Sequence, residues 1–381
     1  MIDTIVLTLQ PNQFSIFDHN RFSPSTIGLF QAPYYKLGHR SNFKCVQNPT
    51  SEELKKHIYK PRLTVTRRMG IGAFITTLRI EFSIPKLIFG NNFDEVSENH
   101  FEQIINRLYK SLNDMSVMTC PQALRDAPVS AVHYSKNIVL TDYSTPYAIL
   151  KELSKINLNQ KLDLNQTDFR NEGHSLRFRA NSFEIALYDK TKDLQKAKIS
   201  EKRAIERDNA IQLELFDQFK VKRPFEVLRM EIRLNQRAKI RQIFGKIHAN
   251  SDLTFSSVFK EATSQKVLLF YLAYIKNSYS ILAYRPKSNS QLITDIKICN
   301  PKIKMRKMLQ LFALKTLIAD MGTREFREAT KIYGRHNWDR LKNDLSHYRF
   351  PEGLSSPIKV IQQSLTDFKP LRLKDFLSNN A

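Results

Sequence analysis

Residues 228–234 read Leu228-Arg229-Met230-Glu231-Ile232-Arg233-Leu234, with apolar and charged side chains in strict alternation. Successive side chains of a β-strand point to opposite faces, so this stretch predicts a strand with one apolar and one charged face. A similar alternation, with one apolar face, occurs in residues 78–84 (LRIEFSI) and residues 183–188 (FEIALY), where Ala186 and Tyr188 share the second face with Glu184. If the three strands share a sheet, its apolar face packs against helices, and its bare face collects Glu81, Tyr188 and Glu231 with several arginines.

The rest of the chain alternates between strand patterns and helical patterns. Strands are expected at residues 2–9, 62–66, 71–84, 129–140, 175–179, 183–188 and 225–234, and helices at 101–112, 145–156 and 237–247. This order predicts an α+β domain over residues 61–250, with a mostly antiparallel sheet and helices on one face. Residues 1–60 are expected to attach an N-terminal strand and loops to this core. A helical, basic domain is expected at 251–350 and a loose, proline-containing tail at 351–381.

Positive charge dominates the composition. The chain has 60 Lys and Arg against 37 Asp and Glu, a formal net charge of +23. Such a surplus favours a polyanionic partner, most commonly nucleic acid, although a ribosomal-type RNA binder or a membrane-surface protein would also fit. The chain contains no GxxxxGK[ST] phosphate-binding loop, so no ATP-driven helicase activity is expected of it.

Cysteine usage and the apolar runs indicate the compartment. The three cysteines form no CxxC pair, which indicates neither a disulfide framework nor a cysteine zinc site and favours a reducing compartment. The N-terminus lacks the basic segment of a signal peptide, and the longest apolar run, Val267 to Ile275, is too short to span a bilayer. A soluble cytoplasmic protein with no membrane partner is expected.

Tyr188 lies on the expected bare face beside the small Ala186. A tyrosine near strand-borne glutamates has the groups needed for metal-assisted attack on a phosphodiester through a covalent intermediate. Glutamate oxygens suit Mg²⁺ or Mn²⁺, and Lys190 or Lys192 could lower the pKa of the tyrosine or hold the phosphate. The alternative is an ordinary half-solvated antiparallel sheet, whose exposed face alternates in the same way without catalysis.

Other polar residues allow both a functional and a structural interpretation. His133, on the expected strand at 129–140, is a candidate third metal ligand, but a lone strand histidine is more often structural. A basic series at the strand-to-helix junction suits backbone phosphates or plain solvation, and it consists of Arg229, Arg233, Arg237, Lys239 and Arg241. Residues 323–345, with Arg335 and Arg340 as candidate DNA contacts, could form a helix-turn-helix or an ordinary αα-hairpin.

Four stretches, taken in order, resemble one protein family. They are MIDTIVLTL, RIEFSIPKLIFGNN, ALYDKTKDL and VLRMEIRLNQRAKIRQIFG, and together they lie within about residues 1–250. This combination resembles the gene II-type replication initiation proteins of filamentous phages and of related small phages and plasmids. The resemblance implies a rolling-circle initiator that nicks and rejoins one strand at an origin, with a ferredoxin-like sheet distantly related to HUH endonucleases. The sequence contains no intact H-hydrophobic-H motif.

The resemblance also implies roles for individual residues. Tyr188 occupies the position of the family's nucleophile, and Glu231 that of a metal ligand for Mg²⁺ or Mn²⁺. His133 stands where the family often has an acid, and Glu81 lies in the RIEFSIPK hallmark. Implied partners are origin DNA, double- and single-stranded, and the host replication helicase and polymerase in the bacterial cytoplasm. A plasmid-mobilisation relaxase with the same chemistry and a non-catalytic DNA-binding regulator are the alternatives.

Overall fold

The computed structural model describes residues 1–24, 42–50, 52–53, 58–140, 144–156, 167–170, 172–193, 226–283, 287–334, 337, 340–341, 347–349 and 357–372. Its strands are β1 (Ile2–Leu9), β2 (Ser15–Ile16), β3 (Ser23–Pro24), β4 (Phe43–Gln47), β5 (Arg62–Met69), β6 (Phe74–Ser83), β7 (Val117–Met118), β8 (Val129–Leu140), β9 (Thr167–Arg170), β10 (Ser175–Arg179), β11 (Phe183–Asp189) and β12 (Glu226–Leu234). Its α-helices are α2 (Ile84–Phe89), α3 (Phe101–Asp114), α4 (Pro121–Arg125), α5 (Pro146–Leu153), α9 (Arg237–Lys246), α10 (Phe255–Val258), α11 (Glu261–Ala283), α12 (Asn289–Cys299), α13 (Met305–Thr330) and α15 (Pro357–Asp367). Short 3₁₀ helices occur at Pro11–Gln13, His19–Arg21, Glu98–His100 and Lys331–Tyr333. The α+β class and the helical C-terminal region predicted from the sequence are confirmed.

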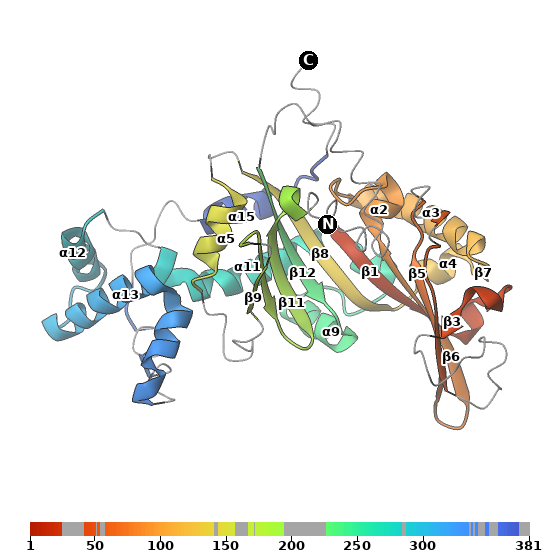
Figure 1. The fold of residues 1–381 in the computed structure, drawn as a ribbon, viewed down its shortest axis with the longest axis horizontal. Coiled ribbons are helices and arrows are strands. Elements are labelled where there is room, and N and C mark those ends of the chain that lie inside the picture. Colours follow the sequence, from red (N-terminus) through yellow and green to blue (C-terminus); the bar gives the residue numbers. More distant parts are fainter. Residues whose placement is uncertain are drawn as a thin grey trace, which may run out of the picture.

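One large antiparallel sheet organises the molecule (Figure 1). In the described part of the chain it has ten strands in the order β3-β4-β5-β6-β1-β8-β12-β11-β10-β9, and each neighbouring pair runs antiparallel. The N-terminal strand β1 lies inside the sheet, between β6 and β8. The first residues of the chain are therefore built into the centre of the fold.

The strand register brings the predicted polar positions to one face. Arg229 of β12 lies between Tyr188 of β11 and Asn137 of β8, each directly opposite it. Two residues along β12, Glu231 lies opposite Ala186 of β11. Residues two apart share a face of a strand, so these side chains share one surface of the sheet.

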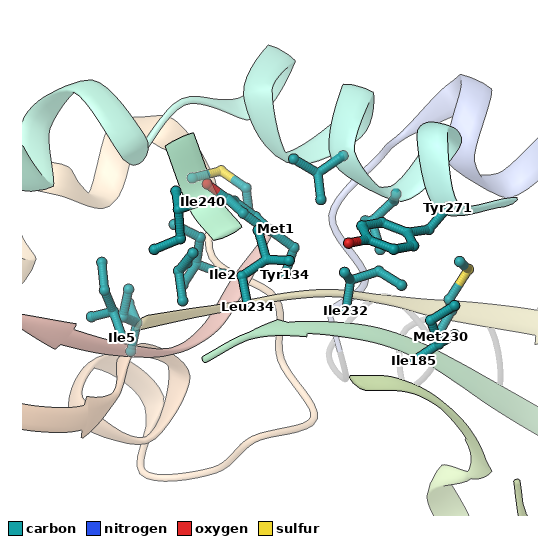
Figure 2. Packing of buried hydrophobic residues seen from close by; sticks show 14 of the residues in the cluster. Met1, Ile2, Ile5, Tyr134, Ile185, Met230, Ile232, Leu234, Ile240 and Tyr271 are labelled. Atoms are coloured by element: carbon teal, nitrogen blue, oxygen red, sulfur yellow. The ribbon is translucent and has the colours of Figure 1, made fainter. Parts of the chain in front are cut away.

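Helices cover the other, apolar face (Figure 2). Ile240 of α9 and Tyr271 of α11 pack over β12, which carries Ile232 and Leu234. All four side chains are buried, because the alternation of β12 turns its apolar residues toward these helices. The helical stripes and the strand alternation therefore meet in one core.

Three regions differ from the sequence-based expectation. Residues 43–47, expected as loop, form β4, where Phe43 and Cys45 are buried on either side of the exposed Lys44. Residues 357–367, expected as loose tail, form α15, which buries Ile358, Ile361 and Leu365 at helical spacing. α11, expected in a separate helical domain, packs against β8 and β12 of the sheet. None of the described helices combines the length and apolar character needed to cross a membrane.

Candidate active site

The polar face of the sheet holds a tyrosine and a glutamate in direct contact. The Tyr188 hydroxyl donates a hydrogen bond to Glu231 Oε2 over 3.0 Å. The two residues are diagonal neighbours, since Tyr188 lies opposite Arg229 and Glu231 lies opposite Ala186. Diagonal cross-strand partners are within reach of long and aromatic side chains, and the methyl group of Ala186 leaves the path between them open. The sequence prediction that Tyr188 and Glu231 share a face is confirmed.

Glu231 is a buried carboxylate that its neighbours hold in the charged form. Its Oε1 accepts a 2.8 Å hydrogen bond from Arg233 Nε and lies 3.4 Å from His133 Nδ1. Burial opposes ionisation, but Arg233 and His133 outweigh it and hold the pKa of Glu231 well below its usual value. Arg233 is itself shared with Glu184, 3.2 Å away. The carboxylate next to the tyrosine is therefore ionised, and it accepts the hydrogen bond of the Tyr188 hydroxyl in that form.

Tyr188 is protonated and largely enclosed. Its side chain is only 9 % exposed. Burial raises its pKa well above 10, and the negative charge of Glu231 adds to this rise although Arg229 opposes it. The hydroxyl cannot lose its proton to water at neutral pH, so any reaction at this oxygen needs a neighbouring base. Glu231, which accepts the hydrogen bond of the hydroxyl, is the group placed to act as that base.

Arg229 is a structural cation beneath the site, which corrects the expectation that it contacts DNA. It is 2 % exposed, and its Nη2 donates to Asp3 Oδ1 over 2.6 Å and to Ser135 Oγ over 2.9 Å. Its Nη1 donates to the backbone oxygen of Asn92 over 2.7 Å. An arginine enclosed in this way presents no edge to a phosphate backbone on the surface. It instead places a positive charge beside Tyr188.

Lys190 adds a second buried cation-forming group near the tyrosine. Its Nζ donates to Asn92 Oδ1 over 2.9 Å and lies 5.8 Å from the centre of the Tyr188 ring. Burial, assisted by the charge of Arg229, lowers the pKa of Lys190 to about 7. Lys192 enters the region through its backbone N–H, which donates to Asp189 Oδ1 over 2.9 Å. Of the two lysines proposed from the sequence, Lys190 is the one with a described contact to the tyrosine.

The expected ligands of a divalent cation are Glu231, His133 and Glu81, and their positions show whether they could bind one together. Both oxygens of Glu231 already accept hydrogen bonds, from Tyr188 and Arg233. Glu81 lies on β6, with β1 between it and the strand of His133, a separation of about 10 Å at the usual strand spacing. Within the described ranges, no three His, Cys, Asp or Glu side chains are grouped to hold a metal ion. As they lie, the three expected ligands do not fit a divalent cation, and Mg²⁺ or Mn²⁺ stays a prediction of the resemblance.

The remaining basic candidates are distributed over the surface. Arg237 and Arg241 on α9 are exposed, whereas Lys239 lies over the Phe183 ring at 4.5 Å. Arg340 is exposed, and Arg335 lies outside the described residues. The exposed side chains can meet a phosphate backbone, and their contact with DNA stays a prediction.

Sequence patterns do not identify several partners of the site. Asp3 comes from a bulged start of β1, where the pairing with β8 shifts register between Ile2 and Thr4. Asn92 lies in the loop after α2, and the sequence indicates only a turn there. The one signal in the sequence is Asp3 itself, an acid that interrupts an otherwise apolar strand. These residues reach Arg229 from more than a hundred positions away, so no local pattern pairs them.

No protein-family model matches this chain, and no significant match is found among curated proteins or solved structures. The family resemblance therefore stays a prediction. Function is inferred from the side chains around Tyr188.

Proposed function

We propose that this protein is a DNA-nicking and strand-rejoining enzyme that initiates rolling-circle replication, with Tyr188 as its nucleophile. The observation that carries the proposal is the 3.0 Å hydrogen bond from the Tyr188 hydroxyl to the buried, ionised carboxylate of Glu231. A weak nucleophile paired with an oriented base is the arrangement that covalent catalysis requires. The net charge of +23 suits a DNA substrate.

Tyr188 and Glu231 define the step that cuts the DNA strand. The Tyr188 oxygen attacks the phosphorus while its proton passes to Glu231, and the bond from phosphorus to the 3′ oxygen breaks. The leaving 3′ oxygen takes a proton from water and Glu231 returns its proton to water, which leaves a 5′-phosphotyrosine and a free 3′-hydroxyl. Arg229 lies near Tyr188 and Arg233 lies against Glu231, so both supply positive charge close to the phosphate oxygens that become more negative during attack. Attack by a 3′-hydroxyl on the phosphotyrosine reverses the step, so rejoining needs no ATP.

A tyrosine-to-phenylalanine pair tests the proposal. Tyr188→Phe removes the nucleophile, so nicking of supercoiled DNA that carries the cognate origin should disappear while binding persists. Tyr134→Phe is the matched control, because Tyr134 is fully buried on the apolar side and its hydroxyl has no hydrogen-bond partner among the described residues. Nicking at the wild-type rate by Tyr188→Phe would overturn the proposal.

A second candidate function is a DNA-binding regulator without catalysis. The observation in its favour is the enclosure of Tyr188, whose small exposed fraction and raised pKa also describe a structural tyrosine. Wild-type protein that binds origin DNA and does not nick it, with Mg²⁺ or Mn²⁺ added, would support this second function. A relaxase would share the chemistry of the first candidate and differ only in its biological setting.

A further inference from the structure

The hairpin formed by β5 and β6 extends beyond the sheet (Figure 1). β4 pairs with β5 only as far as Arg67, and β1 pairs with β6 only from Leu78 onward. Between these points, among the residues that the structure describes, residues 68–75 form strand pairs only with each other, as a two-stranded ribbon. Arg68 and Met69 continue β5 and the turn at residues 70–73 closes the arm, which extends about 10 Å beyond Arg67 at the usual strand rise.

The tip of this arm is apolar and exposed. Ile71 is fully exposed, and Met69 is 62 % and Ile75 44 % exposed. The turn closes with a hydrogen bond from the Gly70 N–H to the Ala73 oxygen, and Gly72 adopts a positive φ of 79° that favours glycine. The turn therefore holds Ile71 at the apex, where its side chain contacts little of the protein. Exposing these side chains to water is unfavourable, which marks the tip as a contact site.

Arginines line one face of the β5–β6 hairpin, from the arm back into the sheet. Residues 62–83 contain four arginines and a single acid, Glu81. Arg62, Arg68 and Arg79 are exposed and share the face of Glu81 by alternation and register. The same face carries Thr4 and His133 across β1 and β8, and it continues to Glu231. The basic face of the hairpin thus leads from the arm toward the candidate active site.

We propose that the β5–β6 arm binds a groove of duplex DNA, with its arginines on the phosphates and Ile71 against the bases. The major groove, about 12 Å wide and 8.5 Å deep, admits a two-stranded ribbon, and the arm is long enough to reach its floor. Exposed apolar side chains on DNA-binding ribbons can also wedge between base steps. The inference rests on the proposed function for the identity of the partner, and it adds the element that holds the duplex beside Tyr188.

Binding of a labelled duplex, followed by fluorescence anisotropy over a salt series, tests this arm. The Arg68→Ala/Arg79→Ala double variant should reduce the slope of log Kd against log salt by about 2, since each phosphate contact contributes about one. Ile71→Ser should weaken binding several-fold and leave that slope unchanged. The controls are Lys110→Ala, on the exposed side of α3, and Ile298→Ser, where the isoleucine is 68 % exposed on the distant α12 (Figure 1). Both should bind as wild type does.

The outcomes separate this arm from the nicking proposal. If both arm variants bind duplex as tightly as wild type, the arm is not the DNA contact, whereas Tyr188-dependent nicking is unaffected by that result. If wild type binds anionic phospholipid vesicles in an Ile71-dependent way and does not bind duplex, the partner is a membrane surface and the inference is wrong. If arm variants lose binding and Tyr188→Phe still nicks, the arm stands and the nucleophile does not.

Discussion

Tyr188 and Glu231 meet across the diagonal between two strands, with Ala186 in the position directly opposite the glutamate. A larger residue at position 186 would stand between the hydroxyl and the carboxylate. On the other side of Glu231, Arg233 donates a hydrogen bond that keeps the Glu231 carboxylate ionised. The tyrosine proton therefore points at a charged acceptor. This arrangement distinguishes the polar face from a merely solvated one, because the pair is buried and the charges are matched.

Replacing the acceptor should stop nicking and leave DNA binding intact. Glu231→Gln keeps the shape of the side chain but cannot take the proton, and loss of a general base costs about 10²–10⁴-fold in rate. The nicking rate of supercoiled origin DNA at saturating enzyme measures this. Glu81→Gln is the matched control on the same face, where Glu81 is half-exposed and 3.8 Å from Arg79. A metal-dependent loss of nicking in Glu81→Gln would favour the metal-ligand role over this account.

The stability of the protein should rise with pH above neutrality. Lys190 has a pKa of about 7 in the fold, against an ordinary lysine pKa of 10.5, so over that range the unfolded chain binds a proton that the folded chain does not. Stability therefore increases with pH across this window, by at most about 1.4 kcal/mol per pH unit. The Met1 amine, with a pKa lowered by burial from 8.0 to about 6, acts in the same direction at lower pH.

Urea unfolding of wild type and Lys190→Met, measured from neutral pH to about pH 9, checks this prediction. The variant carries no titrating group at this position, so its stability should change less with pH. Lys110→Met, at an exposed position of α3, should follow the wild-type curve. Equal pH dependence in Lys190→Met and wild type would show that the lysine is not buried as described.

Glu95 should anchor the loop that holds Asn92, both to β8 and to the segment after α15. Glu95 accepts from Lys136 Nζ at 2.5 Å and from the Leu371 N–H at 2.9 Å, and its own N–H donates to the Leu371 oxygen. Glu95→Gln leaves Lys136 buried beside a neutral partner and should cost about 3–5 kcal/mol of unfolding free energy. Urea denaturation measures the loss. Glu102→Gln, in the exposed pair with Arg125, should leave stability nearly unchanged, and similar effects of the two variants would contradict this role for Glu95.

Alternation in the sequence is sufficient to predict most of the central strands and one side of the site. β11 and β12 carry their pattern in consecutive residues, so the alternation alone assigns Tyr188 and Glu231 to one face. The pattern does not reveal β4, because its five residues offer too short a period beside a proline-containing stretch. It does not reveal α15 either, because the surrounding prolines suggest a tail, although the apolar residues of this helix recur at helical spacing.

The rest of the site depends on contacts between distant parts of the chain. Alternation places Arg229 on the polar face and so suggests a DNA contact, but it does not reveal that Asp3 and Asn92 enclose the side chain there. A side chain on the bare face of a sheet can still be covered by a loop. Burial of this kind is a tertiary property, and one sequence does not encode it in any local pattern.

The covalent intermediate tests the central claim most directly. The proposed 5′-phosphotyrosine would join the protein to the cut strand, so wild type incubated with labelled single-stranded origin DNA should give a protein–DNA adduct that survives denaturation. Peptide mapping of that adduct should place the nucleotide on Tyr188, and the Tyr188→Phe variant should form none. An adduct on another residue, or nicking by wild type without any adduct, would contradict the account.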